Sequence, residues 1–433
     1  RERAALRSND GAGWPDWVCR THGTASHSAV PRFRDAAHDA IFLSWKQRTA
    51  SDFRCDRKAD WCAGGDRSRD CHGSIGSTAV YCNYQKRNDS EYMKEKEIWS
   101  GYQSRMRRFH MVNRGLAVLI LLFAALSLCV GSVSYSVREV FQTLFGAKIQ
   151  GVFYAVNEVR LPRMLSGALA GAAFGMAGYC FQTLLRNPLA SPDVIGISSG
   201  TSTAAVFCIL YLKMQGSMVS AIAVIFGILT AVVVYLLASP GGHFSHGKMI
   251  LTGIGVAALF DAVTSYLLTK TAEFNVSATM QWLSGNLNGV ERKDIPLLAV
   301  VVLGLGMVLC LLERHLQTLA LGETYAIVFG MNVRKEYLVL ILCGVCLVAV
   351  PTAVTGPIAS VAFLSGPIAS RLAGYARANV LPSALTGSLL VLVSDFIGNH
   401  VLPVHYPVGV ITGLLGAPYM LYLLIAMNKK GEI

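Results

Sequence analysis

Charged residues are scarce in this chain of 433 residues. Asp, Glu, Lys and Arg make up 15% of it, against roughly a quarter in soluble globular proteins, while hydrophobic residues make up 53%. This balance excludes an ordinary soluble enzyme and a largely disordered chain. The scarcity is uneven, because residues 1–110 hold 20 of the 38 Lys and Arg and 14 of the 26 Asp and Glu. The sequence therefore predicts a polar segment, 1–110, and a segment, 111–433, that lies in lipid.

Further absences exclude other functional classes. No G-x-x-x-x-G-K-[ST] motif occurs, so we expect no ATP hydrolysis by this chain and no catalytic residues. The cysteines and histidines of 1–110 are spaced too irregularly for a zinc site, and we expect no metal site and no bound cofactor. The net charge of +12 does not form a basic stripe interleaved with aromatic residues, so no nucleic-acid partner is expected.

The polar segment 1–110 shows no sustained helical or strand period. No apolar run follows the basic residues of its first positions, so no signal peptide is expected. We interpret the segment as a disordered tail, or as translated sequence upstream of the true start. The alternative is a Cys- and His-rich regulatory domain.

The apolar segment contains long hydrophobic runs separated by short polar breaks. A helix needs about 20 mostly apolar residues to cross a bilayer. The runs are continuous and lack the alternation of a β-barrel strand. The sequence therefore predicts an all-α membrane bundle of about ten transmembrane helices, or nine if the short eighth run is not a span. The expected spans are 115–134, 161–185, 194–212, 217–238, 248–269, 295–313, 336–356, 361–374, 380–400 and 407–427.

Lys and Arg residues in the short loops predict the orientation of the bundle. If the first span enters from the cytoplasm, more of these cations lie inside than outside, so both termini are expected in the cytoplasm. Arg160 and Arg163 then lie outside, against this rule, which makes them candidates for a function.

Small residues follow one face of the second predicted span, at Gly167, Gly171, Gly175 and Gly178. Small side chains let helix backbones approach closely, and in lipid such packing replaces the hydrophobic effect between helices. We therefore expect the second span to lie in the middle of the bundle.

Three motifs occur in a fixed order along the apolar segment. They are R-L-P-R at 160–163 followed by R-N-P-L-A-S-P at 186–192, L-G-E-T-Y-A-I-V-F-G at 321–330, and Asp395 followed by P-V-G-V-I-T-G-L-L-G-A-P at 407–418. In this order and spacing, the chain over 113–428 resembles the FecCD-type permease subunit of ABC importers for iron–siderophore complexes, haem and cobalamin. Gly366 and Pro367 resemble the ferric catecholate, enterobactin-like branch.

The resemblance implies the fold of a type II ABC importer permease in the bacterial cytoplasmic membrane. It implies a dimer with a second permease, either an identical chain or a sister chain, on a dimer of ABC ATPase subunits that hydrolyses the ATP. A periplasmic or lipid-anchored binding protein is implied to deliver an iron–siderophore complex. The chain itself is then a non-catalytic subunit surrounded by membrane lipid.

The resemblance also implies roles for particular residues. The stretch 321–330 resembles a coupling helix that enters a cleft on the ATPase, with an ordinary amphipathic loop as the alternative. Two outer arginines are implied to receive acidic residues of the binding protein, or else to anchor in lipid headgroups. The loop after the second span is implied to narrow the pathway, with simple helix termination as the alternative. The residues assigned are Gly322, Glu323, Ala326 and Gly330 for coupling, Arg160 and Arg163 for docking, and Asn187, Leu189, His246 and Gly247 for the pathway.

Each residue type suits its expected role in the coupling stretch. Glu323 is favoured near a helix start by the helix dipole. Ala326 is expected to keep the contact with the ATPase close, and Gly330 to allow a turn.

Two carboxylates, Asp261 and Asp395, fall within predicted spans. An intramembrane carboxylate is costly and indicates a function by default. Asp395 belongs to the third motif and is expected to satisfy a neighbouring span, whereas Asp261 is expected to face the pathway. A secondary transporter driven by protons through either carboxylate is the alternative from another class, although no convincing inverted repeat supports it. Haem and cobalamin are alternative substrates.

Overall fold

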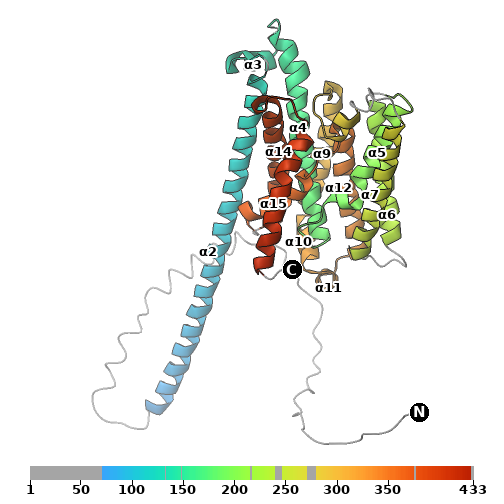
Figure 1. Ribbon diagram of the computed structural model, residues 1–433. Coiled ribbons are helices and arrows are strands. Elements are labelled where there is room, and N and C mark those ends of the chain that lie inside the picture. Colours follow the sequence, from blue (N-terminus) through green and yellow to red (C-terminus); the bar gives the residue numbers. More distant parts are fainter. Residues whose placement is uncertain are drawn as a thin grey trace, which may run out of the picture. The chain divides into compact units, whose positions relative to one another are not determined.

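Every regular element in the described part of the chain is a helix, and no strand occurs there. The chain divides into two units, Arg1–Asp89 and Ser90–Ile433. The helices of the second unit are shown in Figure 1. The computed structural model describes residues 71–131, 133–147, 149–214, 217–238, 246–270, 279–374 and 377–430.

The described elements run along the chain in an order that matches the predicted spans, with short helices between them. They are α2 (Cys71–Cys129), α3 (Val137–Leu144), η3 (Tyr154–Arg160), α4 (Leu161–Leu184), η4 (Pro192–Ile195), α5 (Ile197–Leu210), α6 (Ser217–Ala238), α7 (His246–Thr269), η6 (Arg292–Asp294), α9 (Ile295–Leu311), α10 (Glu313–Leu321), α11 (Glu323–Val328), α12 (Val333–Thr355), α13 (Val361–Ala373), α14 (Val380–Phe396), η7 (Ile397–Val401) and α15 (Val408–Lys430).

The prediction of about ten membrane helices is confirmed among the described residues. Eight helices are long and apolar enough to cross a membrane, and two shorter apolar helices, α5 and α13, stand at the places of the third and eighth predicted spans. At about 1.5 Å per residue, each of these two covers only about 20 Å of the roughly 30 Å of hydrocarbon. The 3₁₀ helix η4 directly precedes α5, and a short non-helical stretch around Pro357 precedes α13.

The expectation of a disordered polar segment is wrong for residues 71–110, because α2 is helical from Cys71 onward. The absence of a helical period in this segment explains why its helix was not predicted. A helix that is polar all round carries no apolar stripe, so residues with good helix propensity, such as Lys, Glu and Gln, leave no periodic signal. Residues 1–70 lie outside the described residues, and so does the proposed Cys- and His-rich domain over them.

Helix α4 lies inside the bundle, as its glycines predict. It packs against α9, α12, α13 and α14, and Figure 1 shows it between α14 and α9. A Cβ atom on Gly171 would meet the backbone of Gly387 in α14, and one on Gly178 would meet the backbone of Ala362 in α13. The glycines therefore bring helix backbones into direct contact, and the predicted central position of this span is confirmed.

A short amphipathic helix, α3, follows the first span and was not predicted. Ser136 and Glu139 form a reciprocal cap at its start: the Ser136 N–H donates to Glu139 Oε2 at 2.9 Å, and the Glu139 N–H donates to Ser136 Oγ at 3.3 Å. Val140 and Thr143 are buried, whereas Phe141 and Phe145 are exposed and their ring centroids lie 4.6 Å apart. Eight residues are too few to cross a bilayer, so no hydrophobic run of spanning length marks α3 in the sequence.

The cap makes the stability of α3 depend on pH. The Ser136 backbone N–H, and then its side chain, hold the pKa of Glu139 below its ordinary value of 4.5. A carboxyl whose pKa is lowered by folding stabilises the fold fully above its ordinary pKa, and this contribution is lost as the pH falls through the lowered pKa. We expect hydrogen exchange of the first turn of α3, corrected for intrinsic rates, to be constant from pH 7 to 5 and to accelerate below about pH 4. Glu139→Gln should exchange faster at pH 7 and lose most of that acid dependence.

Candidate functional site

The stretches predicted for coupling and for docking lie at two opposite ends of the bundle (Figure 1). Figure 1 shows α10 and α11 at the end where α15 finishes, and α3 at the opposite end. The residues predicted for coupling lie at the first end, and those predicted for docking lie near the start of α4 at the second. The structure therefore keeps the two expected contact regions apart.

The coupling stretch is a short helix held between two glycines. Gly322 has a φ of 133° and precedes α11, whereas Gly330 has a φ of 79° and follows it. Residues with a Cβ rarely adopt such angles, so glycine is needed on both sides. Glu323 occupies the first turn of α11, where the helix dipole favours a carboxylate. The turn predicted at Gly330 is confirmed.

The expected role of Ala326 in an outside contact is wrong. Ala326 is fully buried and belongs to the main apolar core, so its small side chain allows α11 to pack onto the bundle itself. The face that α10 and α11 present outward is instead formed by large apolar side chains that the sequence analysis did not single out. They are Leu321, Tyr325, Ile327, Val328 and Phe329, with exposed fractions from 60% to 77%. A run of apolar residues outside every predicted span was the signal available for them.

The candidate gate residues lie in two separate environments. The Asn187 side-chain oxygen accepts a hydrogen bond of 2.9 Å from the Leu189 N–H, which closes the turn after α4 as its amide predicts. Leu189 packs against a cluster that joins α13 and α15. Gly247 stands in the first turn of α7, which packs against α5 and α6. The side chain of His246 lies outside the described residues.

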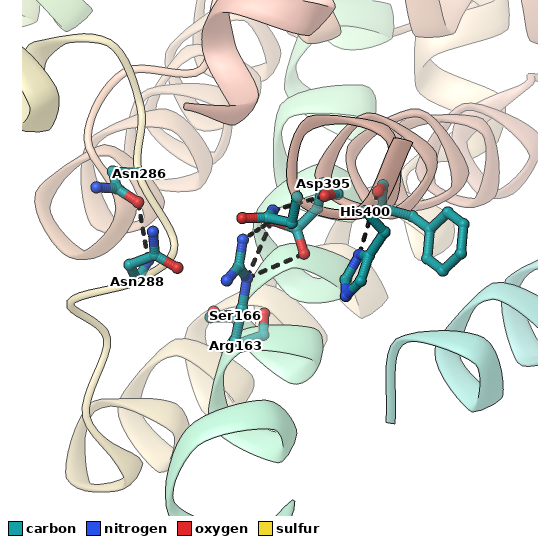
Figure 2. A network of polar contacts seen from close by, with 8 residues as sticks. Arg163, Ser166, Asn286, Asn288, Asp395 and His400 are labelled. Carbon is teal, nitrogen blue, oxygen red and sulfur yellow. Dashed lines mark hydrogen bonds and ion pairs between the residues drawn. The ribbon is translucent and has the colours of Figure 1, made fainter. Parts of the chain in front are cut away.

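Asp395 and Arg163 form a bidentate ion pair between α14 and α4. Figure 2 shows the guanidinium directed at the carboxylate, with Nη2 at 2.7 Å from Oδ1 and Nε at 3.0 Å from Oδ2. The side chains are 21% and 5% exposed. Asn399, one helical turn after Asp395, donates to the Asp395 backbone oxygen at 2.6 Å and to Oδ1 at 3.2 Å. Asp395 thus satisfies a neighbouring span, as predicted, and the partner is one of the arginines predicted for docking.

Arg160 is also held by this chain. Its guanidinium donates to the backbone oxygens of Leu128 at 2.8 Å and Val133 at 2.5 Å, and its Cζ lies 4.8 Å from the ring centroid of Tyr135. The Leu128 carbonyl is one of the last four of α2, which have no partner within the helix, and Val133 lies in the segment that follows α2. Both arginines therefore connect spans, and their docking role stays a prediction.

Asp261 lies at a partly open cavity of about 410 Å³ that both polar and apolar side chains line. The cavity is bordered by α5, α7, η4 and the chain before α13, and Asp193 and several Ser and Thr hydroxyls line it. Asp193 accepts hydrogen bonds from Ser191 and Ser198, whereas no hydrogen bond or ion pair joins the Asp261 carboxylate to any described residue. The Asp261 side chain is exposed in this chain, and an unpaired carboxylate of this kind is costly unless water reaches it. The expectation that it faces the pathway stays a prediction.

Comparison with known proteins gives consistent matches. The family model described as the FecCD transport family matches residues 118–426. The ferric enterobactin transport system permease protein FepG of Escherichia coli (strain K12) is 35% identical over 302 residues, which cover 69% of this chain and 91% of that protein. The Fe(3+)-citrate import system permease protein YfmE of Bacillus subtilis (strain 168) is 33% identical over 317 residues, covering 73% and 95%.

A solved structure is also similar to this chain. It is described as an inward-facing conformation of a metal-chelate type ABC transporter, and it matches with a TM-score of 0.64 and 27% identity. The match covers 73% of this chain and 99% of that one. The family model and the solved structure therefore both match most of this chain.

Proposed function

The chain belongs to the FecCD transport family, whose members are permeases of siderophore and iron-chelate ABC importers, and we propose that this permease carries a ferric catecholate of the enterobactin type. FepG, which is named for ferric enterobactin, supports this substrate, as do Gly366 and Pro367. YfmE is named for ferric citrate at a similar identity, so the shared class is the iron chelate. An iron chelate brings its own ligands to the metal, so no iron site is needed in the permease.

One observation carries the proposed mechanism. The chain has no phosphate-binding loop, and at one end of its membrane bundle it presents an apolar helix fixed between two positive-φ glycines. Such a surface fits an apolar cleft on a soluble partner. We propose that this partner is an ABC ATPase dimer, which hydrolyses the ATP while the permease moves the substrate.

The remaining partners follow from the same proposal. The permease pairs with a second permease and receives its substrate from a periplasmic or lipid-anchored binding protein at the end opposite α11. Arg160 and Arg163 stand near that end, and Arg163 keeps a partly exposed side chain through which acidic residues of the binding protein can be reached. The protein is a multi-pass protein of the bacterial cytoplasmic membrane, and we place both termini and α11 in the cytoplasm.

A second candidate function rests on Asp261. An unpaired carboxylate on the wall of a cavity is suited to proton coupling, as in a secondary transporter. The test is uptake by proteoliposomes that contain this permease with or without its ATPase. Uptake driven by a proton gradient without the ATPase would replace the ABC proposal. Radiolabelled ferric catecholate, compared with ferric hydroxamate in a strain that lacks the gene, would test the substrate.

Replacing Gly330 should uncouple the transporter. In Gly330→Leu, an L-residue must adopt the positive φ, which costs about 1–2 kcal/mol and shifts the geometry of α11. We expect ATP-driven uptake by the complete transporter to fall about ten-fold, while membrane insertion is unchanged.

Gly374→Leu is the matched control, because Gly374 has nearly the same φ, 78°, and lies outside the coupling stretch. A Cβ on either glycine would meet no heavy atom within 4 Å, so crowding does not distinguish the two positions. If both variants transport equally, the coupling assignment of 321–330 is wrong.

A further inference from the structure

Tyr337 is a buried tyrosine with two charged partners. It lies in the second turn of α12 and is 2% exposed. The side chains of Arg186 and Glu323 lie within hydrogen-bonding reach of its hydroxyl. Since a guanidinium can only donate and a carboxylate accepts, Arg186 donates to the hydroxyl oxygen and the hydroxyl donates to Glu323. One hydroxyl thus connects a cation and an anion from two other segments.

The two charged partners come from the two segments that matter for coupling. Glu323 begins α11, and Arg186 directly precedes the gate candidate Asn187 in the turn after α4. An Arg186 nitrogen also lies 4.0 Å from the place that a Cβ on Gly322 would occupy, so the guanidinium reaches the glycine turn before α11. The side chain of Arg186 therefore bridges from the gate loop, the turn at residues 186–190 after α4, to the coupling stretch, residues 321–330.

The backbone of Arg186 shows that its position is held by its surroundings. Its φ is 49°, and outside glycine such values are uncommon and persist only where neighbouring contacts fix them. Its N–H donates to the Thr183 oxygen at 3.2 Å, which continues the last turn of α4. A change in the contacts of the Arg186 side chain is thus passed directly to a strained turn of the gate loop.

We infer that Arg186, Tyr337 and Glu323 form a latch that transmits movement of the coupling stretch to the gate loop, and that Arg186 and Tyr337 are positioning residues of the transport cycle. The inference rests on the proposed function, because it requires a partner that moves α11. Movement of Glu323 changes its bond to Tyr337, and Tyr337 in turn changes the bond to Arg186. Coupling of this kind needs a continuous chain of contacts that can adopt discrete arrangements. A buried hydroxyl between two charged side chains provides such a chain, because each of its hydrogen bonds is either made or broken.

The latch can be tested in the complete transporter, with its ATPase and binding protein, in proteoliposomes. Tyr337→Phe removes one hydroxyl and keeps the buried ring, and Arg186→Gln removes the charge. Both should lower the substrate taken up per ATP hydrolysed by about ten-fold, as expected for a hydrogen bond to a charged group, while the ATPase still binds. Arg186→Lys, which keeps a cationic donor, should recover part of the loss.

A double-mutant cycle separates a latch from two independent structural roles. If both residues act through one connection, the Arg186→Gln, Tyr337→Phe double variant should lose no more than either single variant. Arg377→Gln is the control, since it removes a cation from an ion pair with Glu313, 3.5 Å long, near the same end of the bundle. The amount of substrate that this variant takes up per ATP hydrolysed should stay at the wild-type value.

Two outcomes would overturn the inference in different ways. An unchanged yield per ATP in Tyr337→Phe and Arg186→Gln, or fully additive losses, would reject the latch and leave the transporter assignment intact. Absence of ATP-dependent uptake by the wild-type complex would reject the proposed function, and the latch with it.

Discussion

Gly178→Val is expected to remove most of the folded permease from the membrane. A Cβ at this position would coincide with the carbonyl group and the Cα of Ala362, so the backbones of α4 and α13 would have to separate. Backbone atoms cannot rotate away as a flexible side chain can, and overpacking of this kind costs about 3 kcal/mol. Size-exclusion chromatography of a fluorescent fusion in mild detergent should show loss of the monodisperse peak.

Gly255→Val is the matched control for this change. Gly255 lies in α7, and a Cβ on it would meet no heavy atom within 4 Å, so the same added side chain should be tolerated. Equal losses in both variants would mean that valine harms any span, and a normal peak for Gly178→Val would contradict the close approach of α4 and α13.

Asp395→Ala should also cause a large loss of stability, through its effect on the partner Arg163. The change leaves Arg163 unpaired in the bundle, and breaking a buried ion pair from one side costs about 3–5 kcal/mol. Because Arg163 is 21% exposed and retains some access to water, we expect the lower end of this range. Thermal unfolding of the purified permease should report a clear fall in Tm.

The double variant Arg163→Met, Asp395→Leu tests whether the unpaired charge is the cause. Replacing both partners by apolar side chains of similar volume removes the charge problem, so most of the stability should return. Glu158→Ala provides a comparison, since its pair with Arg292 is exposed on both sides and should contribute less than about 1 kcal/mol. A double variant as unstable as Asp395→Ala would show that the ion pair is not what stabilises this junction.

The sequence predicts the membrane helices well because lipid leaves few alternatives. Backbone groups in hydrocarbon must be bonded within a helix or a closed barrel, so hydrophobic length alone locates the spans. The same physics explains the failures. The polar part of α2 lies outside this constraint and has no apolar stripe, and α3 is too short to register as a span.

The candidate site was predicted less completely, because its contacts join distant parts of the chain. Motif resemblance located the coupling stretch and its turn at Gly330, but it did not say which side of α11 would face the bundle, so Ala326 was misplaced. Arg163 and Asp395 were both singled out, yet 232 positions separate them, and nothing in the sequence pairs them. The connection from Arg186 through Tyr337 to Glu323 likewise depends on three segments that only folding brings together.

The short lengths of α5 and α13 also determine where the bundle can hold solvent. Each helix is shorter than the hydrocarbon is thick, so neighbouring chain is also needed at membrane depth, where backbone N–H and C=O groups must be bonded or must face a cavity. Before α5 this chain is the short 3₁₀ helix η4, and before α13 it is a non-helical stretch. Asp193 in η4 and Pro357 in that stretch line the same cavity. The shortness of two helices and the presence of a cavity between them are thus one property of the fold.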